Sequence, residues 1–251
     1  MIKTSKTKLD LSNITLVAVA CVRVEKTIKA MKYSMNGIRF GAVKLITSEV
    51  IEDDTIDVIQ IDKLDYNAFN HFVVYELWKY IETDYALRIE DDGFIVHRNA
   101  WRKDFLDYDY IGAPWPMPQD TFSYRDTFGN LIRVGNGGFS LRSRKLLKLP
   151  TDLNMEWKPY FGFYHEDGFI TCHNRHLFEA AGCVFAPLEV AKYFSHEHKI
   201  PENEGIVPFG FHGKFSKYNA LLQTKKNKSW ISRFKNVAFS IKSKWINNKR
   251  L

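Results

Sequence analysis

Hydrophobic and polar residues alternate along the first ninety positions in a pattern typical of strands and helices in turn. Four short, mostly apolar runs have the length of buried strands, and they lie at 14–22, 41–47, 56–61 and 85–89. Two intervening stretches, 25–35 and 66–81, are typical of helices, and Asp65 precedes the second as a favoured N-cap. This alternation predicts an α/β fold in which helices cover both faces of a mostly parallel central sheet.

The second half of the chain is less regular. Prolines at positions 114, 116 and 118 interrupt any regular element, and the polar stretch 119–130 is expected to form a loop. A helix is expected over 168–181, ending near Gly182. We find no internal repeat. We therefore expect an N-terminal extension over residues 1–13, one domain over 14–215 and a tail over 216–251.

Composition narrows the class of protein. With 45% hydrophobic and 15% aromatic residues among 251, the chain can bury a core, which excludes disorder throughout. Three cysteines at irregular spacing exclude a disulfide scaffold and favour a reducing compartment. No apolar run approaches the ~18–20 residues of a membrane span, and residues 1–10 lack the apolar core of a signal peptide. A soluble, cytoplasmic protein is the resulting expectation.

The net charge of +7 comes from the tail. From Gly205 onward the chain has eleven Lys and Arg and no Asp or Glu, which leaves 25 basic and 29 acidic residues in the rest. This mildly acidic body argues against a nucleic-acid-binding domain. A helix over 229–246 would carry one apolar stripe bordered by basic residues, made of Trp230, Phe234, Val237, Ile241 and Trp245. Such a helix is typical of contact with an anionic membrane surface, and docking on the protein itself or on another subunit is the alternative.

Carboxylates gather directly after the apolar run at 85–89. Glu90, Asp91 and Asp92 are adjacent, and like charges at the end of a strand repel one another unless a cation lies among them. Mg²⁺ or Mn²⁺ prefers oxygen ligands and keeps open positions for substrate phosphates. On an extended segment Glu90 and Asp92 point the same way and Asp91 points opposite, so one or two of the three reach a single ion. A solvated acidic turn is the alternative.

Three later features carry candidate chemistry. The stretch 134–142 places three glycines before an apolar strand, where the backbone either approaches a ligand closely or simply turns. Glu166 and Asp167 stand at the start of a predicted helix, where an acid either caps the helix or acts as a general base. His212 lies between aromatic residues and glycines, and a lone histidine is more often structural than a ligand.

Other histidines and aromatics give weaker signals. Cys172 and His173 together with His176 could suggest a zinc site, but they lack a paired cysteine motif and the fourth ligand at regular spacing. The histidines at 196 and 198 flank Glu197 in a polar segment and are expected to be exposed. Three aromatic residues could stack on sugar or base rings or pack in the core, namely Trp115, Trp157 and Tyr160.

Taken in order, these features resemble a metal-dependent glycosyltransferase of the GT-A fold. More closely, the chain is similar to a bacterial family of GT-A-like transferases known only as a domain of unknown function. Four strings carry the resemblance, which covers roughly Ile14 to Gly213: RIEDDGFIV, FLDYDYIGAPW, VGNGGFSLRS and HEDGFI. Their combination is specific, although each string alone is not. The resemblance implies a single GT-A-like, Rossmann-related domain.

The resemblance also implies a metal and donor site. In GT-A enzymes an Asp-x-Asp motif binds Mn²⁺ or Mg²⁺ on the diphosphate of a nucleotide sugar, and Glu90-Asp91-Asp92 occupies that place here. Asp92 corresponds to the direct metal ligand, and His212 to the late histidine that completes the metal shell. Glu90 departs from the usual Asp, so its contact could be to the ion, to ribose or through water. Asp91 is expected to share in donor binding.

The same resemblance assigns the sugar-binding and catalytic positions. Gly137, Gly138 and Phe139 correspond to the segment that lines the donor sugar and the acceptor. Asp167 corresponds to the base of inverting members, with Glu166 as the alternate base or a sugar-binding group. The implied reaction moves a sugar from a nucleotide-sugar donor, above all a UDP-sugar, to a glycan or lipid-linked saccharide in bacterial surface polysaccharide synthesis. The tail would hold such an enzyme at the inner face of the cell membrane.

Two other classes of protein stay open. The first is a metal-dependent phosphohydrolase or nucleotidyltransferase that uses the same acidic cluster. The second is a non-catalytic glycan-binding module, against which the joint presence of Glu90, Asp91, Asp92, Asp167 and His212 argues.

Overall fold

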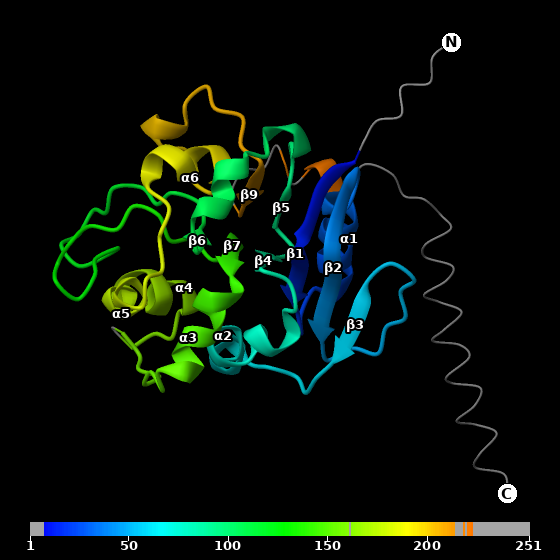
Figure 1. Cartoon of the computed structure of the whole chain (residues 1–251), viewed down its shortest axis with the longest axis horizontal. Helices are drawn as coiled ribbons and strands as arrows, with labels where there is room; N and C mark the ends of the chain where they lie inside the picture. Colours follow the sequence, from blue (N-terminus) through cyan, green and yellow to red (C-terminus); the bar gives the residue numbers. More distant parts are fainter. Residues whose placement is uncertain (1–7, 161, 214–217, 219, 223–251) are drawn as a thin grey trace, which may run out of the picture.

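A six-stranded sheet runs through the part of the chain that the computed structural model describes, residues 8–160, 162–213, 218 and 220–222 (Figure 1). Its strands are β1 (Leu9–Val19), β2 (Ile38–Thr47), β3 (Asp57–Gln60), β4 (Tyr85–Ile89), β6 (Tyr110–Ile111) and β7 (Phe139–Ser143). They lie in the order β3-β2-β1-β4-β7-β6, with the first four parallel. Strand β7 is antiparallel to both β4 and β6. The predicted α/β fold with a mostly parallel sheet is confirmed.

Helices cover both faces of this sheet. The helices among the described residues are α1 (Val24–Ser34), α2 (Tyr66–Tyr75), α3 (Arg144–Asp152), α4 (Glu166–Gly168), α5 (Arg175–Ala180) and α6 (Leu188–Phe194). Successive side chains of a strand point to opposite faces. Leu16 and Ala18 of β1 accordingly pack in the core that α1 covers, whereas Val17 and Val19 pack in the core beneath α2. The sheet is therefore buried on both sides, as a parallel sheet requires.

Several predicted elements are confirmed, and others need correction. Strand β4 occupies the predicted positions 85–89, and Asp65 caps α2 by accepting a hydrogen bond from the backbone N–H of Ala68 at 2.8 Å. Strand β1 begins at Leu9 rather than at position 14 and ends at Val19. The helix predicted over 66–81 ends at Tyr75, and a 3₁₀ turn over 77–80 follows it.

The helix predicted over 168–181 is interrupted. After α4, residues 169–173 form a π-helical turn, and α5 follows. The carbonyl of Phe169 accepts the backbone N–H of Asn174 at 3.0 Å and the side-chain amide of the same residue at 3.2 Å. The hydroxyl of Thr171 also donates to the carbonyl of Asp167 at 2.7 Å. These side-chain contacts compete with regular helical bonding, which apolar periodicity alone does not reveal.

A second, three-stranded sheet brings the end of the domain to the carboxyl end of β4. Its strands are β5 (Gly93–Ile95), β8 (Ser195–His196) and β9 (Gly210–His212), in the order β5-β9-β8. Strand β5 follows β4 after three residues and pairs antiparallel with β9, so that Gly93 lies opposite His212. The acidic residues after β4 and the late histidine therefore become neighbours through strand pairing.

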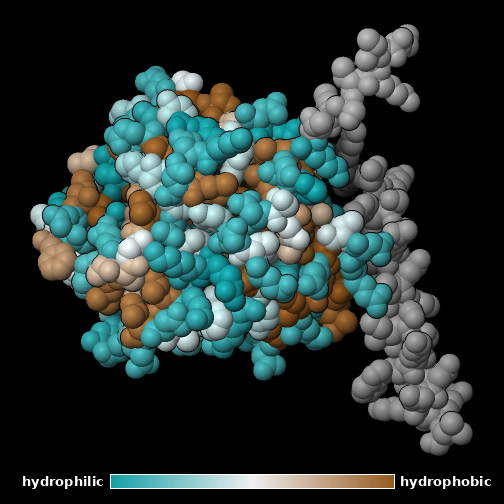
Figure 2. Space-filling model, viewed as in Figure 1, coloured by the Kyte–Doolittle hydropathy of each residue, from teal (hydrophilic) through white to brown (hydrophobic). Residues whose placement is uncertain are grey.

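Of the predicted tail, only Tyr218 and residues 220–222 are described, and Tyr218, Leu221 and Leu222 pack against the core that α1 covers. The rest of the tail lies outside the described residues. The basic apolar stripe expected over 229–246 therefore stays a prediction, as do the domain boundaries at 13 and 215. No helix within the described ranges combines the length and the hydropathy needed to cross a membrane. The face of the molecule in Figure 2 is a mosaic of hydrophilic and hydrophobic side chains.

Candidate functional site

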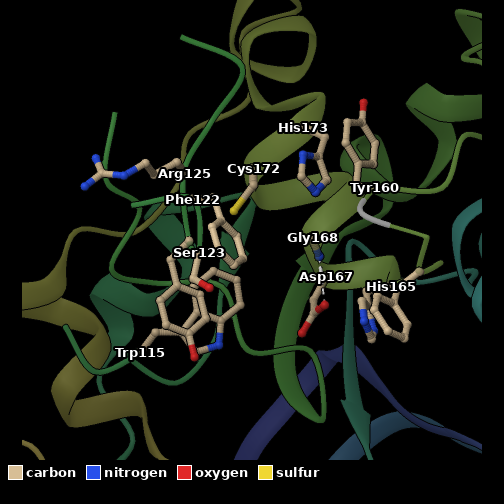
Figure 3. Close-up of a pocket in the computed structure, with 12 residues that line it drawn as sticks. Trp115, Phe122, Ser123, Arg125, Tyr160, His165, Asp167, Gly168, Cys172 and His173 are labelled. Atoms are coloured by element: carbon tan, nitrogen blue, oxygen red, sulfur yellow. Dashed lines mark hydrogen bonds between the residues drawn. The ribbon is translucent and has the colours of Figure 1, made fainter. Parts of the chain in front are cut away.

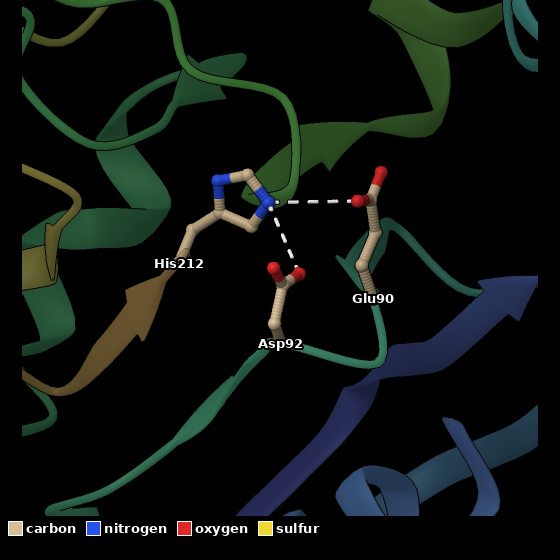
Figure 4. Close-up of side chains that lie close together, drawn as sticks. All are labelled: Glu90, Asp92 and His212. Atoms are coloured by element: carbon tan, nitrogen blue, oxygen red, sulfur yellow. Dashed lines mark ion pairs between the residues drawn. The ribbon is translucent and has the colours of Figure 1, made fainter. Parts of the chain in front are cut away.

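Two carboxylates and a histidine converge at the carboxyl end of β4 (Figure 4). Glu90 and Gly93 exchange backbone hydrogen bonds of 3.2 Å, which close the turn that carries Asp92. His212 Nε2 lies 3.5 Å from Glu90 Oε2 and 3.5 Å from Asp92 Oδ1. One ligand atom from each of the three residues lies within 4.8 Å of the others. Glu90 and Asp92 thus face the same way, as the strand pattern predicts.

Asp91 faces helix α1 instead. Its carboxylate lies 3.2 Å from a guanidinium nitrogen of Arg23 and 2.9 Å from Nζ of Lys26, and its side chain is 7% exposed. These contacts hold the start of α1 against the acidic turn. The side chain of Asp91 therefore points away from Glu90 and Asp92. The part that the resemblance implies for Asp91 in donor binding stays a prediction.

The three convergent side chains fit a hard divalent cation. Two carboxylate oxygens and one imidazole nitrogen form a donor set that Mn²⁺ accepts. In an octahedral shell with bonds of about 2.1 Å, adjacent ligand atoms lie about 3.0 Å apart and opposite ones about 4.2 Å apart. The two separations of 3.5 Å at His212 fall between these values. Small side-chain movements would therefore suffice to close the shell.

Electrostatics in this cluster favour a positive charge at its centre. Burial opposes a charged imidazole, but hydrogen bonds with Asp92, Glu197 and Glu90 outweigh it and hold the pKa of His212 well above its ordinary value. The hydrogen bond from His212 lowers the pKa of Asp92. Burial would raise the pKa of Glu90, yet Arg88 and His212 hold that pKa well below its usual range. Without a bound ion, the imidazolium itself supplies the positive charge between the carboxylates.

The second ring nitrogen of His212 also has polar contacts. Its Nδ1 lies 3.3 Å from Glu197 Oε1 and 3.1 Å from the amide nitrogen of Asn136. A carboxylate such as that of Glu197, which accepts the Nδ1 proton, fixes the orientation of a metal-binding imidazole. The amide oxygen of Asn136 is buried without a hydrogen bond among the described residues.

Sequence reasoning missed Glu197. The segment around it was expected to be an exposed polar loop, but it continues from β8, and His196 is only 3% exposed. The ring of His196 is anchored by the carbonyl of Lys192 at 2.8 Å. No spacing in the sequence singles out Glu197, because its importance arises from the pairing of β8 with β9, which places it beside His212.

A buried ion network links this cluster to the Glu-Asp pair. Arg88 donates to Glu90 Oε1 at 2.6 Å and lies 3.2 Å from Glu166 Oε1, while Arg142 lies 2.7 Å from Glu166 Oε2. The side chains of Arg88, Arg142 and Glu166 are 2%, 0% and 6% exposed. Charges buried to this degree are tolerated only when they are paired. Both oxygens of Glu166 are held by arginines, which favours a structural role over that of alternate base.

The glycines of the predicted turn make room for these side chains. A Cβ on Gly137 would fall 2.1 Å from Glu166 Oε1, and one on Gly138 would fall 2.2 Å from His212 Nε2. The turn backbone thus lies directly against both groups. The ring of Phe139 is 0% exposed and packs among core phenylalanines, so its predicted place in the sugar site is not favoured.

Asp167 lines a cavity of about 390 Å³ (Figure 3). One carboxylate oxygen, Oδ1, accepts the backbone N–H of Gly168 at 2.7 Å, which leaves Oδ2 for a ligand. Burial, reinforced by the charge of Glu166, raises the pKa of Asp167 to about 7. A carboxylate with this pKa can take up a proton at neutral pH, as a general base must.

Most of the remaining candidate residues line this cavity. Cys172 and His173 line it, and the ring of His173 stacks on Tyr160. Among the described residues these two do not belong to a group of metal-ligating side chains. Trp115 also lines the cavity and is 6% exposed. Trp157 packs on core aromatic rings instead.

Comparison of the sequence with known families gives one match. A family model described as "Protein of unknown function (DUF5672)" matches residues 57–212, which is more than half of the chain. No curated protein matches the sequence.

Solved structures show the same architecture at low sequence identity. The chain is similar to a glycosyltransferase involved in the glycosylation of the major capsid of PBCV-1, with 10% identity and a TM-score of 0.51 over 84% of this chain and 99% of that one. It is similar to the galactosyltransferase LgtC, solved with donor and acceptor sugar analogues, with 11% identity and a TM-score of 0.53 over 87% and 99% of the two chains. These likenesses show a GT-A-like, Rossmann-related fold.

A further match is weaker. The chain spans 48% of the bifunctional IspDF of Campylobacter jejuni, with 69% of its own length covered, 12% identity and a TM-score of 0.42.

Proposed function

The chain belongs to the DUF5672 family, and on that premise we propose that it is a metal-dependent glycosyltransferase. It would move a sugar from a nucleotide-sugar donor to a glycan or lipid-linked saccharide acceptor. The observation that carries the proposal is the convergence of Glu90, Asp92 and His212 at the carboxyl end of β4, where open α/β sheets bind their ligands. The GT-A-like fold shared with two glycosyltransferases supports it.

Glu90, Asp92 and His212 would hold Mn²⁺ or Mg²⁺. When bound, the ion offsets the charge that develops on the diphosphate of the donor as it leaves. Arg88 holds Glu90 from one side, and Glu197 orients His212 from the other, so the ligand atoms are positioned before the ion arrives.

Asp167 would act as the base. Its free Oδ2 takes the proton of the acceptor hydroxyl, while that oxygen forms a bond to the anomeric carbon and the bond from this carbon to the donor phosphate breaks. A pKa of about 7 lets Asp167 be ionised before the step and protonated after it. Attack from the face opposite the leaving group inverts the anomeric configuration.

The donor nucleotide, the biological setting and the membrane placement in this proposal rest on the sequence. A UDP-sugar is the favoured donor, and synthesis of bacterial surface polysaccharide is the proposed setting. The basic tail over 216–251 would place the enzyme at the cytoplasmic face of a membrane. Sedimentation of the full chain with anionic vesicles, compared with a chain that ends at 222 and so keeps the core contacts of Tyr218, tests this placement: equal pelleting of both proteins counts against it.

Calorimetric titration with UDP tests the donor site. We expect the wild-type chain to bind UDP with Mn²⁺ present and to lose most of that affinity when EDTA removes the ion. Asp92→Asn should abolish the Mn²⁺-dependent part, because it removes a charged ligand. Asp54→Asn, at an exposed position outside the cluster, is the matched control. UDP binding that is indifferent to Mn²⁺ and to Asp92→Asn contradicts the proposal.

Product analysis separates transfer from hydrolysis. The chain is incubated with Mn²⁺ and a panel of nucleotide sugars, with and without saccharide acceptors. Transfer predicts a new glycoside that forms only with an acceptor. Release of sugar phosphate and nucleoside monophosphate at the same rate in both conditions would indicate a phosphohydrolase instead.

A further inference from the structure

The cavity beside Asp167 is separate from the metal cluster. Its lining includes Asp167 and Gly168, but none of Glu90, Asp92 and His212. A transferase must hold two substrates, and the donor diphosphate belongs at the metal cluster in the proposed function. On that basis, the cavity is the place for the second substrate, with Asp167 able to reach its reacting hydroxyl.

Aromatic rings form most of the cavity wall. Five Phe, Tyr or Trp side chains and two histidines are among its twelve lining residues. On one side Tyr124 stacks on Trp115, with ring centroids 4.6 Å apart and an interplanar angle of 19°. On the other side Tyr160 stacks on His173. Figure 3 shows the carboxylate of Asp167 between the side that carries Trp115 and the side that carries Tyr160 and His173.

The cavity carries little free charge apart from Asp167. Arg125 lines it, but its guanidinium donates to the carbonyl of Gly129 at 2.8 Å and its charge acts on Asp120. Burial lowers the pKa of His173 to about 4, which leaves that imidazole neutral at pH 7. Figure 3 shows the guanidinium of Arg125 pointing away from Asp167, so an anionic ligand placed at Asp167 would be repelled by the ionised carboxylate with no cation directed at it from Arg125.

Apolar surface is left open at the rim. Phe122 is 54% exposed and Phe163 is 61% exposed, and both line the cavity. Covering a large exposed aromatic ring with the apolar face of a ligand removes apolar surface from water, which favours binding. The C–H face of a pyranose ring is such a surface, and its hydroxyl groups point outward from the ring edge. A volume of about 390 Å³ lies near the lower end of small-molecule sites, which suits one or two sugar rings.

We propose that this aromatic cavity binds a neutral pyranose ring of the acceptor, with its C–H face stacked on Tyr124 or Tyr160 and one hydroxyl at Asp167 Oδ2. This inference rests on the proposed function and specifies its acceptor: an uncharged sugar end rather than an acidic sugar or a lipid chain. Asp167 both orients the ring and takes the proton of the hydroxyl that reacts.

Saturation-transfer NMR on the full chain tests the inference. The probes are the methyl glycosides of glucose, galactose and N-acetylglucosamine, with methyl glucuronide as the acidic probe and octyl phosphate as the chain-like probe. UDP and Mn²⁺ are present throughout. We expect at least one neutral glycoside to receive saturation on its ring C–H protons, and to bind more tightly than the glucuronide and the octyl phosphate.

Two variants locate the bound sugar. One of the two variants Tyr160→Leu and Tyr124→Leu should weaken glycoside binding roughly tenfold, because it removes the ring on which the sugar stacks, and the other should change binding less. If neither variant weakens glycoside binding, the sugar does not stack in this cavity and the inference is overturned. Phe128→Leu replaces a ring that is 72% exposed and lies outside the cavity, so it should leave glycoside binding unchanged. Thermal melting of each variant checks that the chain remains folded.

The outcomes separate this inference from the proposed function. If UDP binds with Mn²⁺ but no neutral glycoside binds, or if the glucuronide or the octyl phosphate binds more tightly, the inference is overturned and the proposed function stands. If Tyr160→Leu weakens UDP instead of the glycoside, the cavity serves the donor base, which also overturns it. If neither UDP nor any other nucleoside diphosphate binds with Mn²⁺, both ideas fall.

Discussion

Replacing Asp167 by asparagine tests whether the carboxyl proposed as the base has a raised pKa. Burial raises the pKa of Asp167 from an ordinary 3.8 to about 7. A carboxyl whose pKa is raised on folding binds its proton more tightly in the folded than in the unfolded chain. Stability must therefore fall as the pH rises from about 4 to about 7, and stay level above that range.

The size of this effect follows from the shift. Three pKa units correspond to at most about 4 kcal/mol, at about 1.36 kcal/mol per unit. The side chain is only partly buried, so solvent screening reduces the figure, and we expect about 1–2 kcal/mol between pH 5 and pH 8. The Asp167→Asn variant has no carboxyl to titrate at this position, so its free energy of unfolding should lack this decline.

Urea unfolding at pH 5 and pH 8, without added metal, measures the difference. Relative to the wild type, Asp167→Asn should gain about 1–2 kcal/mol on going from pH 5 to pH 8, or about 2–8 °C in melting temperature. Asp54→Asn, at an exposed position, controls for the loss of one surface carboxylate. Parallel pH dependences for the wild type and Asp167→Asn would refute the raised pKa, and with it the reasoning for Asp167 as the base.

Three further outcomes follow from the same geometry. Glu166→Gln should cost about 3–5 kcal/mol in urea unfolding, because it leaves the buried charges of Arg88 and Arg142 without their shared counterion. Gly138→Ala should weaken Mn²⁺ binding, measured by calorimetry, because its Cβ would fall 2.2 Å from His212 Nε2 and displace that ring. The loss of binding free energy should exceed the loss of unfolding free energy that a lower melting temperature indicates. Mn²⁺ affinity should rise with pH and binding should release a proton, because carboxylates raise the pKa of His212 and the ion needs the neutral imidazole.

The first and the third of these outcomes each have a comparison that could contradict them. Glu179 is 49% exposed and pairs with Arg175 on α5, so Glu179→Gln should cost less than about 1 kcal/mol. A similar loss in both glutamate variants would mean that the buried network contributes no more than a surface pair. Mn²⁺ titrations in two buffers of different ionisation enthalpy count the released protons, and a count of zero would contradict a protonated His212 in the apo chain.

Local patterns predicted the parts of the site that lie close together in sequence. The apolar run before Glu90 gave the bounds of β4, and strand alternation placed Glu90 and Asp92 on one side and Asp91 on the other. The position of His212 beside them depends on the pairing of β5 with β9, more than a hundred residues apart. Only the resemblance to GT-A enzymes, and no periodicity, pointed to that histidine.

The buried ion network escaped sequence reasoning for a physical reason. Arg88 and Arg142 each occupy a position within a strand whose pattern is compatible with an ordinary solvent-facing side chain. They are buried because β4 pairs with β7 and α4 then covers both strands with Glu166. The interrupted helix after Asp167 depends on side-chain hydrogen bonds of Thr171 and Asn174, which apolar spacing does not encode.

Anomalous scattering at the manganese edge, from crystals grown with Mn²⁺ and UDP, tests the central claim most directly. The account predicts one strong peak within bonding distance of Glu90, Asp92 and His212, with the diphosphate of UDP on its open side. A structure in which UDP is bound and these three side chains hold no manganese would contradict the account.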